Sequence, residues 1–304
     1  MSGPGFRYSG EVASSKNPNM KTTLKIATGL LAALALGYSA LLWADSDALW
    51  NIVNRQCVPN QQATGQPAPC VEVNLSGGEA GGYAVLKDRN GWLQYLLIPT
   101  ARLSGIESPE LLIERAPDYW GAAWRARGFL EQRYGRPIPR ELLSLTINSQ
   151  YGRTQNQLHI HISCTNATVR QQLEDLKDSL NEEWRELPVE LQGHVYWARA
   201  LAAKADGGPE VDPFKALAAG LPEAGLEMGH YGLALVATRL TDGRDGFILL
   251  SSRASLIGAN RASVEELQDH ACPALRAGER GASVNGSYAL RLRDNHSHSA
   301  SPPA

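Results

Sequence analysis

Polar and apolar residues alternate strictly from Gln157 to Cys164, and no other stretch of this 304-residue chain constrains the fold as tightly. A period of two is typical of a β-strand with one half-buried face. His159, His161 and Ser163 would point to one side of that strand and the apolar residues to the other. Two imidazoles one pleat apart form a surface that can change its charge near neutral pH. The pattern therefore predicts a nucleophilic or acid–base site, a metal site, or merely a polar sheet face.

The residues before this strand complete a predicted hairpin. The run from Leu143 to Asn148 alternates in the same way, and the segment between the two runs is rich in Gly, Asn, Gln and Thr, as turns are. The hairpin would place the amides of Asn148, Gln155 and Asn156 around the same surface as the two histidines.

The spacing of these residues resembles that of the histidine triad family of nucleotide hydrolases and transferases. Gln155 follows Asn148 by seven positions, His159 follows four positions later, and His and apolar residues then alternate. The third histidine of that family is replaced by Ser163. Within the superfamily, the membrane-anchored CDP-diacylglycerol pyrophosphatases resemble the chain over roughly residues 46 to 272. The resemblance rests on a loop with two cysteines and on the motifs GYAVLKD, YLLIPT, NQLHIHISC and YGLALV.

This resemblance implies an α+β fold, a histidine triad-like antiparallel sheet with helices, and a hydrolase. Its substrate would be the membrane phospholipid CDP-diacylglycerol, cleaved at the pyrophosphate bond to CMP and phosphatidate without a cofactor. His161 would be the nucleophile that carries the nucleotidyl group, and His159 its orienting partner. Ser163 would replace the third imidazole, which is tolerable because phosphatidate leaves as a stable anion.

The resemblance also implies which residues bind the substrate. Asn148, Gln155 and Asn156 would donate hydrogen bonds to phosphate or ribose, and Lys87 and Arg102 are basic residues near the presumed site. No metal is expected, because no carboxylate or third histidine lies at a ligand spacing nearby. Two alternatives remain open: a module that binds nucleotide without turnover, and a metal site. In the metal site, His159 and His161 would be joined by His194, His230 or His270.

The ends of the chain predict an exported enzyme. Residues 24–44 contain a run of 19 residues without a charge, which just spans a bilayer of roughly 30 Å and follows several lysines. We expect a disordered cytoplasmic tail over 1–23, a transmembrane anchor over 24–44, an exported domain over 45–276 and a disordered tail over 277–304. A cleaved signal peptide is the alternative to the anchor. The location implied is the inner membrane, and a net charge of -2 argues against a nucleic-acid partner.

An even number of cysteines agrees with export. The four cysteines allow three pairings, and we expect Cys57 to pair with Cys70 and Cys164 with Cys272. The second pair would fix the histidine strand to the segment after a helix expected over 263–270, which has a Ser263/Glu266 capping box. Other expected helices are 46–56, 119–134 and 166–184, and further strands are 82–87, 92–98, 231–238 and 247–251. A faint echo between the two hairpins suggests two similar halves.

Overall fold

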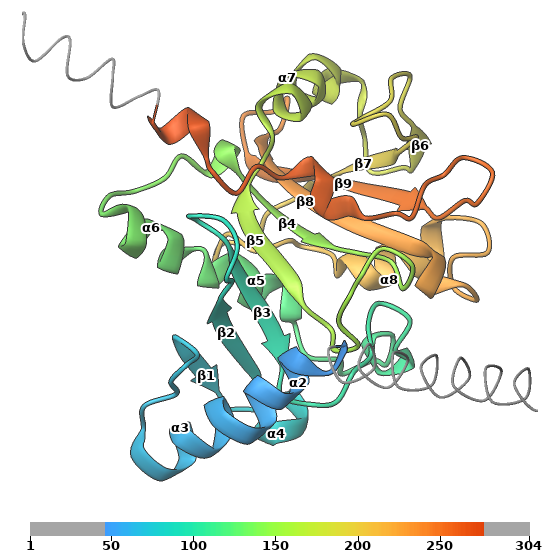
Figure 1. Ribbon diagram of the computed structural model, residues 1–304. Coiled ribbons are helices and arrows are strands. Elements are labelled where there is room, and N and C mark those ends of the chain that lie inside the picture. Colours follow the sequence, from blue (N-terminus) through green and yellow to red (C-terminus); the bar gives the residue numbers. More distant parts are fainter. Residues whose placement is uncertain (1–45, 277–304) are drawn as a thin grey trace, which may run out of the picture. The chain divides into compact units, whose positions relative to one another are not determined.

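The alternating runs of the sequence pair into one antiparallel sheet, which carries helices on both faces (Figure 1). The computed structural model describes residues 46–276 of the chain. Within them the sheet has nine strands in the order β1-β2-β3-β5-β4-β8-β9-β7-β6. The strands are β1 (Glu72–Asn74), β2 (Tyr83–Lys87), β3 (Tyr95–Pro99), β4 (Leu143–Ile147), β5 (Ile160–Cys164), β6 (Arg185–Glu186), β7 (Trp197–Ala202), β8 (Tyr231–Arg239) and β9 (Asp245–Arg253).

The helices are short, and several are single turns. The α-helices are α2 (Ala48–Ile52), α3 (Val58–Thr64), α4 (Gly78–Gly81), α5 (Tyr119–Ala126), α6 (Gly128–Tyr134), α7 (Ala167–Leu176) and α8 (Pro213–Gly220). The π-helical turn η1 (Val53–Cys57) joins α2 to α3. The 3₁₀ turns are η2 (Pro109–Leu111), η3 (Arg140–Leu142), η4 (Lys177–Ser179), η5 (Met228–His230) and η6 (Val264–Leu267).

The expected anchor over 24–44 and the two expected tails lie outside the described residues. In the part of the chain from residue 46 to residue 276, no helix is long and apolar enough to cross a membrane.

One face of the sheet is apolar across its central strands. Leu97, Ile162, Leu145 and Leu249 are all fully buried in one cluster on this face. Helices α5, α6 and α8 cover this face with large side chains, which include Trp120, Trp124 and Phe214. Burial of such side chains is the main favourable contribution to folding.

The opposite face is divided into two apolar regions with a polar strip between them. A row of cross-strand neighbours runs Leu96, His161, Thr146, Ala234 and Leu250 from β3 to β9. Leu96 packs in a cluster with α2, η1 and α3, whereas Ala234 and Leu250 pack in a cluster with α7 and η6. His161 and Thr146 lie between these clusters, so the polar residues of β5 and β4 face a strip that no apolar cluster fills.

The main predicted elements are present with different bounds. The β4–β5 hairpin is confirmed, with Thr146 opposite His161. The helix expected over 119–134 is split between α5 and α6, and the first helix continues through η1 and α3 to Thr64. The halves containing β1–β5 and β6–β9 meet where β4 pairs with β8. Their similarity remains a prediction.

The expected capping box at Ser263 is wrong. The segment forms only the single turn η6, and the Ser263 side chain makes no capping hydrogen bond. Glu266, the expected partner, instead accepts hydrogen bonds from His194 and Tyr196. The Glu266 carboxylate therefore attaches η6 to the segment that precedes β7.

Gly232 allows η6 to lie directly on the sheet. A Cβ at this position would come within 2.4 Å of a Val264 methyl carbon and 2.7 Å of the Ala262 carbonyl oxygen. We expect Gly232→Ala to displace η6, to lower the free energy of unfolding by about 1–3 kcal/mol and to reduce activity. Urea titration and steady-state kinetics measure both effects. Gly258→Ala is the control, since its nearest contact is an ordinary 3.5 Å. Equal losses in the two variants would refute this account.

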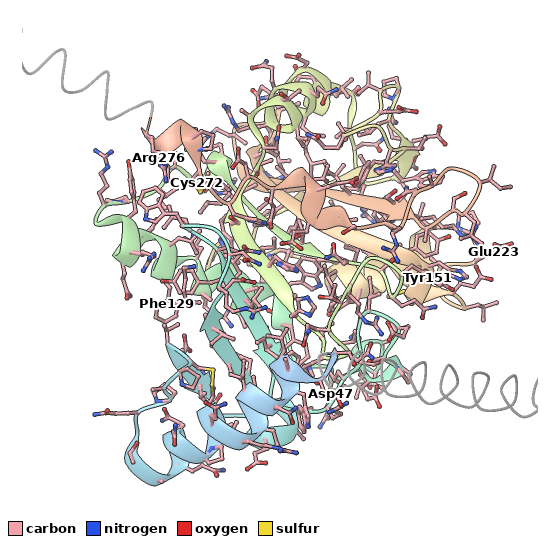
Figure 2. All side chains as sticks on the ribbon, viewed as in Figure 1. Asp47, Phe129, Tyr151, Glu223, Cys272 and Arg276 are labelled. Atoms are coloured by element: carbon pink, nitrogen blue, oxygen red, sulfur yellow. A yellow bond between two sulfur atoms is a disulfide. The ribbon has the colours of Figure 1, made fainter. Side chains whose placement is uncertain are left out.

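Both expected disulfides are confirmed. Cys57 pairs with Cys70, and Cys164 pairs with Cys272 across a sequence separation of 108 residues. Cys272 lies just before the end of the described chain, close to the last residue of β5 (Figure 2). The second disulfide therefore joins the histidine strand to the segment that follows η6.

Candidate active site

The two histidines of β5 lie side by side in the polar strip. Their ring centroids are 4.9 Å apart in an edge-to-face arrangement, and the residues are only 7% and 5% exposed. The His159 Nδ1 atom is 2.7 Å from the Gln157 carbonyl oxygen. Because that oxygen only accepts, Nδ1 carries the proton and donates. Burial lowers the pKa of His159, although this hydrogen bond opposes the shift.

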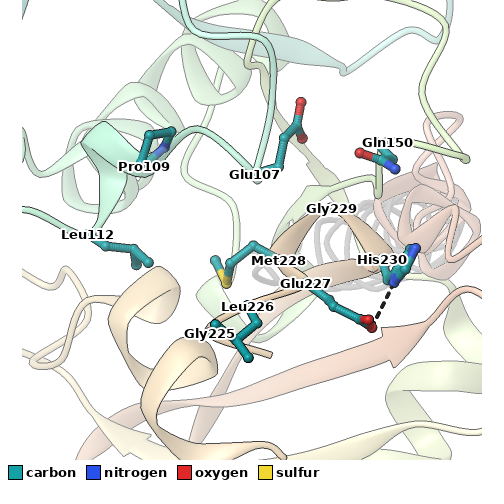
Figure 3. A pocket seen from close by; sticks show the side chains of 10 residues that line it. All are labelled: Glu107, Pro109, Leu112, Gln150, Gly225, Leu226, Glu227, Met228, Gly229 and His230. Carbon is teal, nitrogen blue, oxygen red and sulfur yellow. Dashed lines mark hydrogen bonds and ion pairs between the residues drawn. The ribbon is translucent and has the colours of Figure 1, made fainter. Parts of the chain in front are cut away.

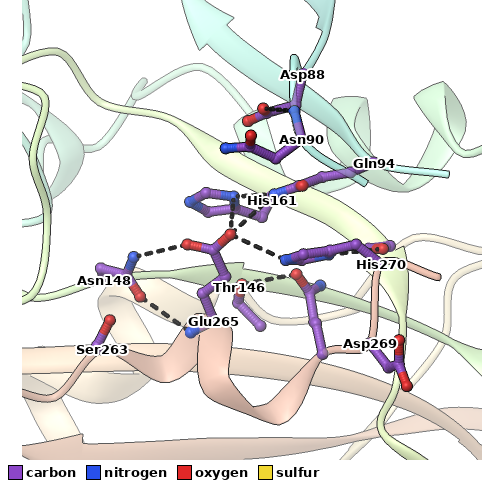
Figure 4. Close-up of polar contacts among 12 residues, drawn as sticks. Asp88, Asn90, Gln94, Thr146, Asn148, His161, Ser263, Glu265, Asp269 and His270 are labelled. Atoms are coloured by element: carbon purple, nitrogen blue, oxygen red, sulfur yellow. Dashed lines mark hydrogen bonds and ion pairs between the residues drawn. The ribbon is translucent and has the colours of Figure 1, made fainter. Parts of the chain in front are cut away.

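Glu265 is the centre of the polar contacts around His161 (Figure 4). Its Oε1 atom lies 3.3 Å from His161 Nδ1, 3.0 Å from His270 Nε2 and 2.9 Å from Gln94 Nε2. Asn148 Nδ2 donates to the other carboxylate oxygen over 3.3 Å. A carboxylate surrounded by so many N–H donors is strongly favoured in its charged form.

Asn148 also fixes the backbone of η6. Its Oδ1 atom accepts a hydrogen bond from the Glu265 amide over 3.0 Å. The next residue, Ser149, donates two hydrogen bonds to the same segment: its amide donates to the Ala262 carbonyl and its hydroxyl to the Arg261 carbonyl. The end of β4 thus holds the chain that precedes Glu265, which places the carboxylate above the sheet.

The electrostatics of this pair make His161 a neutral base beside an anion. Burial lowers the pKa of His161 to about 3. Burial alone would raise the pKa of Glu265, but hydrogen bonds from His270 and Gln94 and the nearby His161 ring lower it to about 2. His161 Nδ1 lies between the Gln94 side-chain amide, 3.0 Å away, and the ionised Glu265 carboxylate, 3.3 Å away. The carboxylate favours a proton on Nδ1, which leaves Nε2 with its lone pair. Nε2 is buried and has no hydrogen-bond partner among the described residues.

A third imidazole, that of His270, joins the site from the C-terminal part of the described chain. His270 Nδ1 lies 3.0 Å from the Ser163 hydroxyl, which itself donates to the Leu93 carbonyl over 2.8 Å. The amides of Trp92 and Leu93 donate to the carbonyl of His270 and fix its backbone. Ser163 stands where the third histidine of the triad pattern would be, and the imidazole of His270 lies beside it.

The other predicted substrate contacts do not gather around His161. Gln155 accepts from the Leu49 amide, Asn156 donates to Ser46, and Arg102 pairs with Asp47 and lies over Trp50. All three hold the start of α2. Lys87 pairs in register with Tyr95, which pairs with Ile162, so it lies on the apolar face of the sheet. Its amine donates to the carbonyls of Asp88 and Gly91.

The histidines considered for a metal site have other partners. His194 pairs with Glu266, and His230 pairs with Glu227 and stacks on Tyr151. Across residues 46–276, no group of three or more His, Cys, Asp or Glu side chains is arranged to hold a metal ion.

A pocket of about 470 Å³, lined in part by His230, lies away from the β5 histidines (Figure 3). Its lining includes Glu107, Gln150 and the segment 225–230, but none of His159, His161, Glu265 and His270. Its own ion pair, between Glu227 and His230, is about a third exposed, whereas the buried imidazoles of His159 and His161 lie on the polar strip.

Two residues of the site, Gln94 and Glu265, were not found from the sequence, and His270 was considered only as a metal ligand. Gln94 carried a signal, since it is a polar residue inside the apolar run that precedes Tyr95. His270 carried one too, because it lies two residues before Cys272, and Ser163 lies one residue before Cys164. The expected disulfide therefore already implied that the two are close. Glu265 has no local signal, since the neighbouring carboxylates of Glu266 and Asp269 have the same chemistry.

Comparisons with known proteins identify the family of the chain. A curated CDP-diacylglycerol pyrophosphatase of Yersinia pestis is 48% identical over 246 residues, which cover 81% of this chain and 91% of the relative. The family model for CDP-diacylglycerol pyrophosphatase matches residues 44–276, which include both disulfides, the β4–β5 hairpin, Glu265 and His270. The chain therefore belongs to the CDP-diacylglycerol pyrophosphatase family.

Proposed function

We propose that the protein hydrolyses the pyrophosphate bond of CDP-diacylglycerol to CMP and phosphatidate through a covalent nucleotidyl intermediate on His161. The observation that carries the mechanism is the state of the His161 ring. Its Nδ1 atom lies between the Gln94 side-chain amide and the ionised Glu265, and its Nε2 atom has no hydrogen-bond partner in the described chain. A neutral imidazole oriented in this way is an activated nucleophile.

The reaction would proceed as two displacements at one phosphorus atom. The Nε2 lone pair forms a bond to the phosphorus of the CMP moiety, and the bond from this phosphorus to the bridging oxygen breaks. The electron pair goes to phosphatidate, which leaves as an anion. Water then attacks the same phosphorus, the N–P electron pair returns to Nε2, and CMP and a proton are released. Splitting the hydrolysis in this way replaces one difficult step with two easier ones.

The remaining predicted residues take supporting roles in this proposal. His159 donates from Nδ1 to the Gln157 carbonyl and packs edge-to-face against the His161 ring, which it orients. Asn148 acts through Glu265, to which both ends of its amide are bonded. Gln155, Asn156 and Arg102 would meet the substrate where α2 begins, and Lys87 is the weakest of the substrate contacts because it faces the opposite side of the sheet.

The compartment belongs to the same proposal. Two disulfides are typical of exported proteins. An enzyme on the periplasmic side of the inner membrane, held there by the single span expected over 24–44, would meet a phospholipid substrate in that membrane. The histidine triad-like ancestry of the hairpin is proposed on its Asn, Gln and His spacing.

One experiment tests the activity and its chemistry together. Purified protein is incubated with CDP-diacylglycerol labelled in the CMP phosphate, with a chelator present. We expect release of CMP and phosphatidate, because the described site offers imidazoles, amides and a single carboxylate rather than a group of metal ligands. Rapid quenching should leave label on the peptide that contains His161, stable to alkali and lost in acid. Activity lost to the chelator and restored by zinc would favour the metal site, and nucleotide binding without release of CMP would favour a binding module.

A further inference from the structure

Glu265 is shared by two imidazoles, only one of which is the proposed nucleophile. The same Oε1 atom is 3.3 Å from His161 Nδ1 and 3.0 Å from His270 Nε2. The side chain of Glu265 is 29% exposed and that of His270 is 22% exposed, whereas that of His161 is 6% exposed. The carboxylate therefore connects a buried ring to one at the edge of the site.

The hydrogen bonds around His270 define its protonation. The Ser163 hydroxyl has one proton, which it donates to the Leu93 carbonyl, so it can only accept from His270 Nδ1. The Glu265 carboxylate can only accept from Nε2. Both ring nitrogens of His270 thus face acceptors, which is the arrangement of a doubly protonated, positively charged imidazole. His270 and Glu265 form an ion pair, while His161 is neutral.

We propose that Glu265 and His270 are positioning residues for the His161 nucleophile, with Glu265 fixing its reactive tautomer and His270 offsetting the charge of Glu265. This inference rests on the proposed nucleotidyl–His161 intermediate. Neither residue belongs to the hairpin motif. The Cys164–Cys272 disulfide and the hydrogen bond from the Asp269 amide to the Cys164 carbonyl hold His270 against Ser163.

The two residues should affect different steps. Once the nucleotidyl group is attached, the His161 ring carries a positive charge, which a carboxylate stabilises. An isolated carboxylate would stabilise this intermediate too strongly and slow its hydrolysis. The positive charge of His270 on the same oxygen limits this effect. Loss of Glu265 should therefore slow formation of the intermediate, and loss of His270 should slow its breakdown.

The test compares Glu265→Gln and His270→Gln in the full chain. For Glu265→Gln we expect kcat to fall by about 100-fold with little change in KM, because the residue acts through His161 and not on the substrate. For His270→Gln we expect kcat to fall by about tenfold. In that variant the fraction of protein labelled at His161 during steady-state turnover should rise above that of the wild type. A purely structural defect would lower this fraction.

The chain supplies a matched pair of controls on the same turn. Glu266 bonds His194 and Tyr196 as Glu265 bonds His161 and His270, but on the outer side of η6. Glu266→Gln and His194→Gln should keep the wild-type kcat. Equal losses in Glu265→Gln and Glu266→Gln, or an unchanged kcat in Glu265→Gln, would overturn the inference. If Glu265→Gln does not fold, the His270→Gln variant decides the question. If labelling of His161 does not rise in that variant, the proposed role of His270 is overturned. Absence of any labelled wild-type protein would instead refute the proposed intermediate.

Discussion

Turnover of CDP-diacylglycerol should fall by roughly 10⁴-fold or more when His161 is replaced by alanine, because the variant lacks the atom that forms the covalent bond. The ring makes no hydrogen bond through Nε2 to any described residue, so its loss leaves the contacts of Nδ1 with Gln94 and Glu265 as the structural ones removed. Steady-state release of CMP measures the effect, and labelling of the protein with the nucleotidyl group should be absent. Circular dichroism and urea titration serve as the controls for folding of the variant.

Ser163→Ala is the comparison that tests the assigned roles. Its hydroxyl contacts the Leu93 carbonyl and His270 but not His161, so the variant should lose about tenfold in kcat. Stability should fall by about 1–3 kcal/mol, since the buried Leu93 carbonyl loses its donor. If kcat falls by the same factor in Ser163→Ala and His161→Ala, the distinct nucleophilic role of His161 is contradicted.

The second large effect should come from removing the disulfide between Cys164 and Cys272. A double variant with alanine at both positions should lose about 4–5 kcal/mol of unfolding free energy, since the bond closes a loop of 108 residues. This is a large share of the roughly 5–15 kcal/mol that stabilises a domain. Activity should fall as well, even where the protein is folded, because His270 is released from Ser163. Urea titration under non-reducing conditions and kcat measured at low temperature separate the two losses.

The other disulfide provides the control for this prediction. Cys57 and Cys70 lie near the β1 edge of the sheet, in the cluster with α2, η1 and α3, and are separated by 13 residues. Replacing both by alanine should cost about 3 kcal/mol and leave kcat almost unchanged. A double variant at Cys164 and Cys272 that keeps the wild-type kcat would show that the disulfide does not position His270.

Structure set by local sequence patterns was predictable, whereas contacts between residues far apart in the chain were not. The β4–β5 hairpin was predictable because a period of two over five or more residues is a local pattern, and the hairpin places His161 opposite Thr146. Glu265 was not predictable, because its role depends on Gly232 allowing η6 to approach the sheet and on Asn148 fixing its amide. Asn148 and Glu265 are 117 positions apart, and Gly232 lies 32 positions before Val264, so no local pattern reports these contacts.

The helix expected over 263–270 was wrong for a related reason. Ser263 and Glu266 have the spacing of a capping box, but tertiary contacts used Glu266 for His194 and Tyr196 instead. The sequence pointed to His270 only as a third ligand of a metal site. The predicted Cys164–Cys272 disulfide, taken together with the position of Ser163, already places its imidazole near the Ser163 hydroxyl.

The long separation between the two halves of the site determines when the chemistry can begin during synthesis. The ribosome delivers the histidine strand more than 100 residues before Cys272, so a growing chain carries His161 long before it carries its partners. The disulfide that holds these partners forms only in an oxidising compartment. On the proposed function, a chain still on the cytoplasmic side would have the nucleophile without its charge partners. The lipid of the inner leaflet would therefore be exposed to an incomplete enzyme, and only the outer leaflet to a complete one.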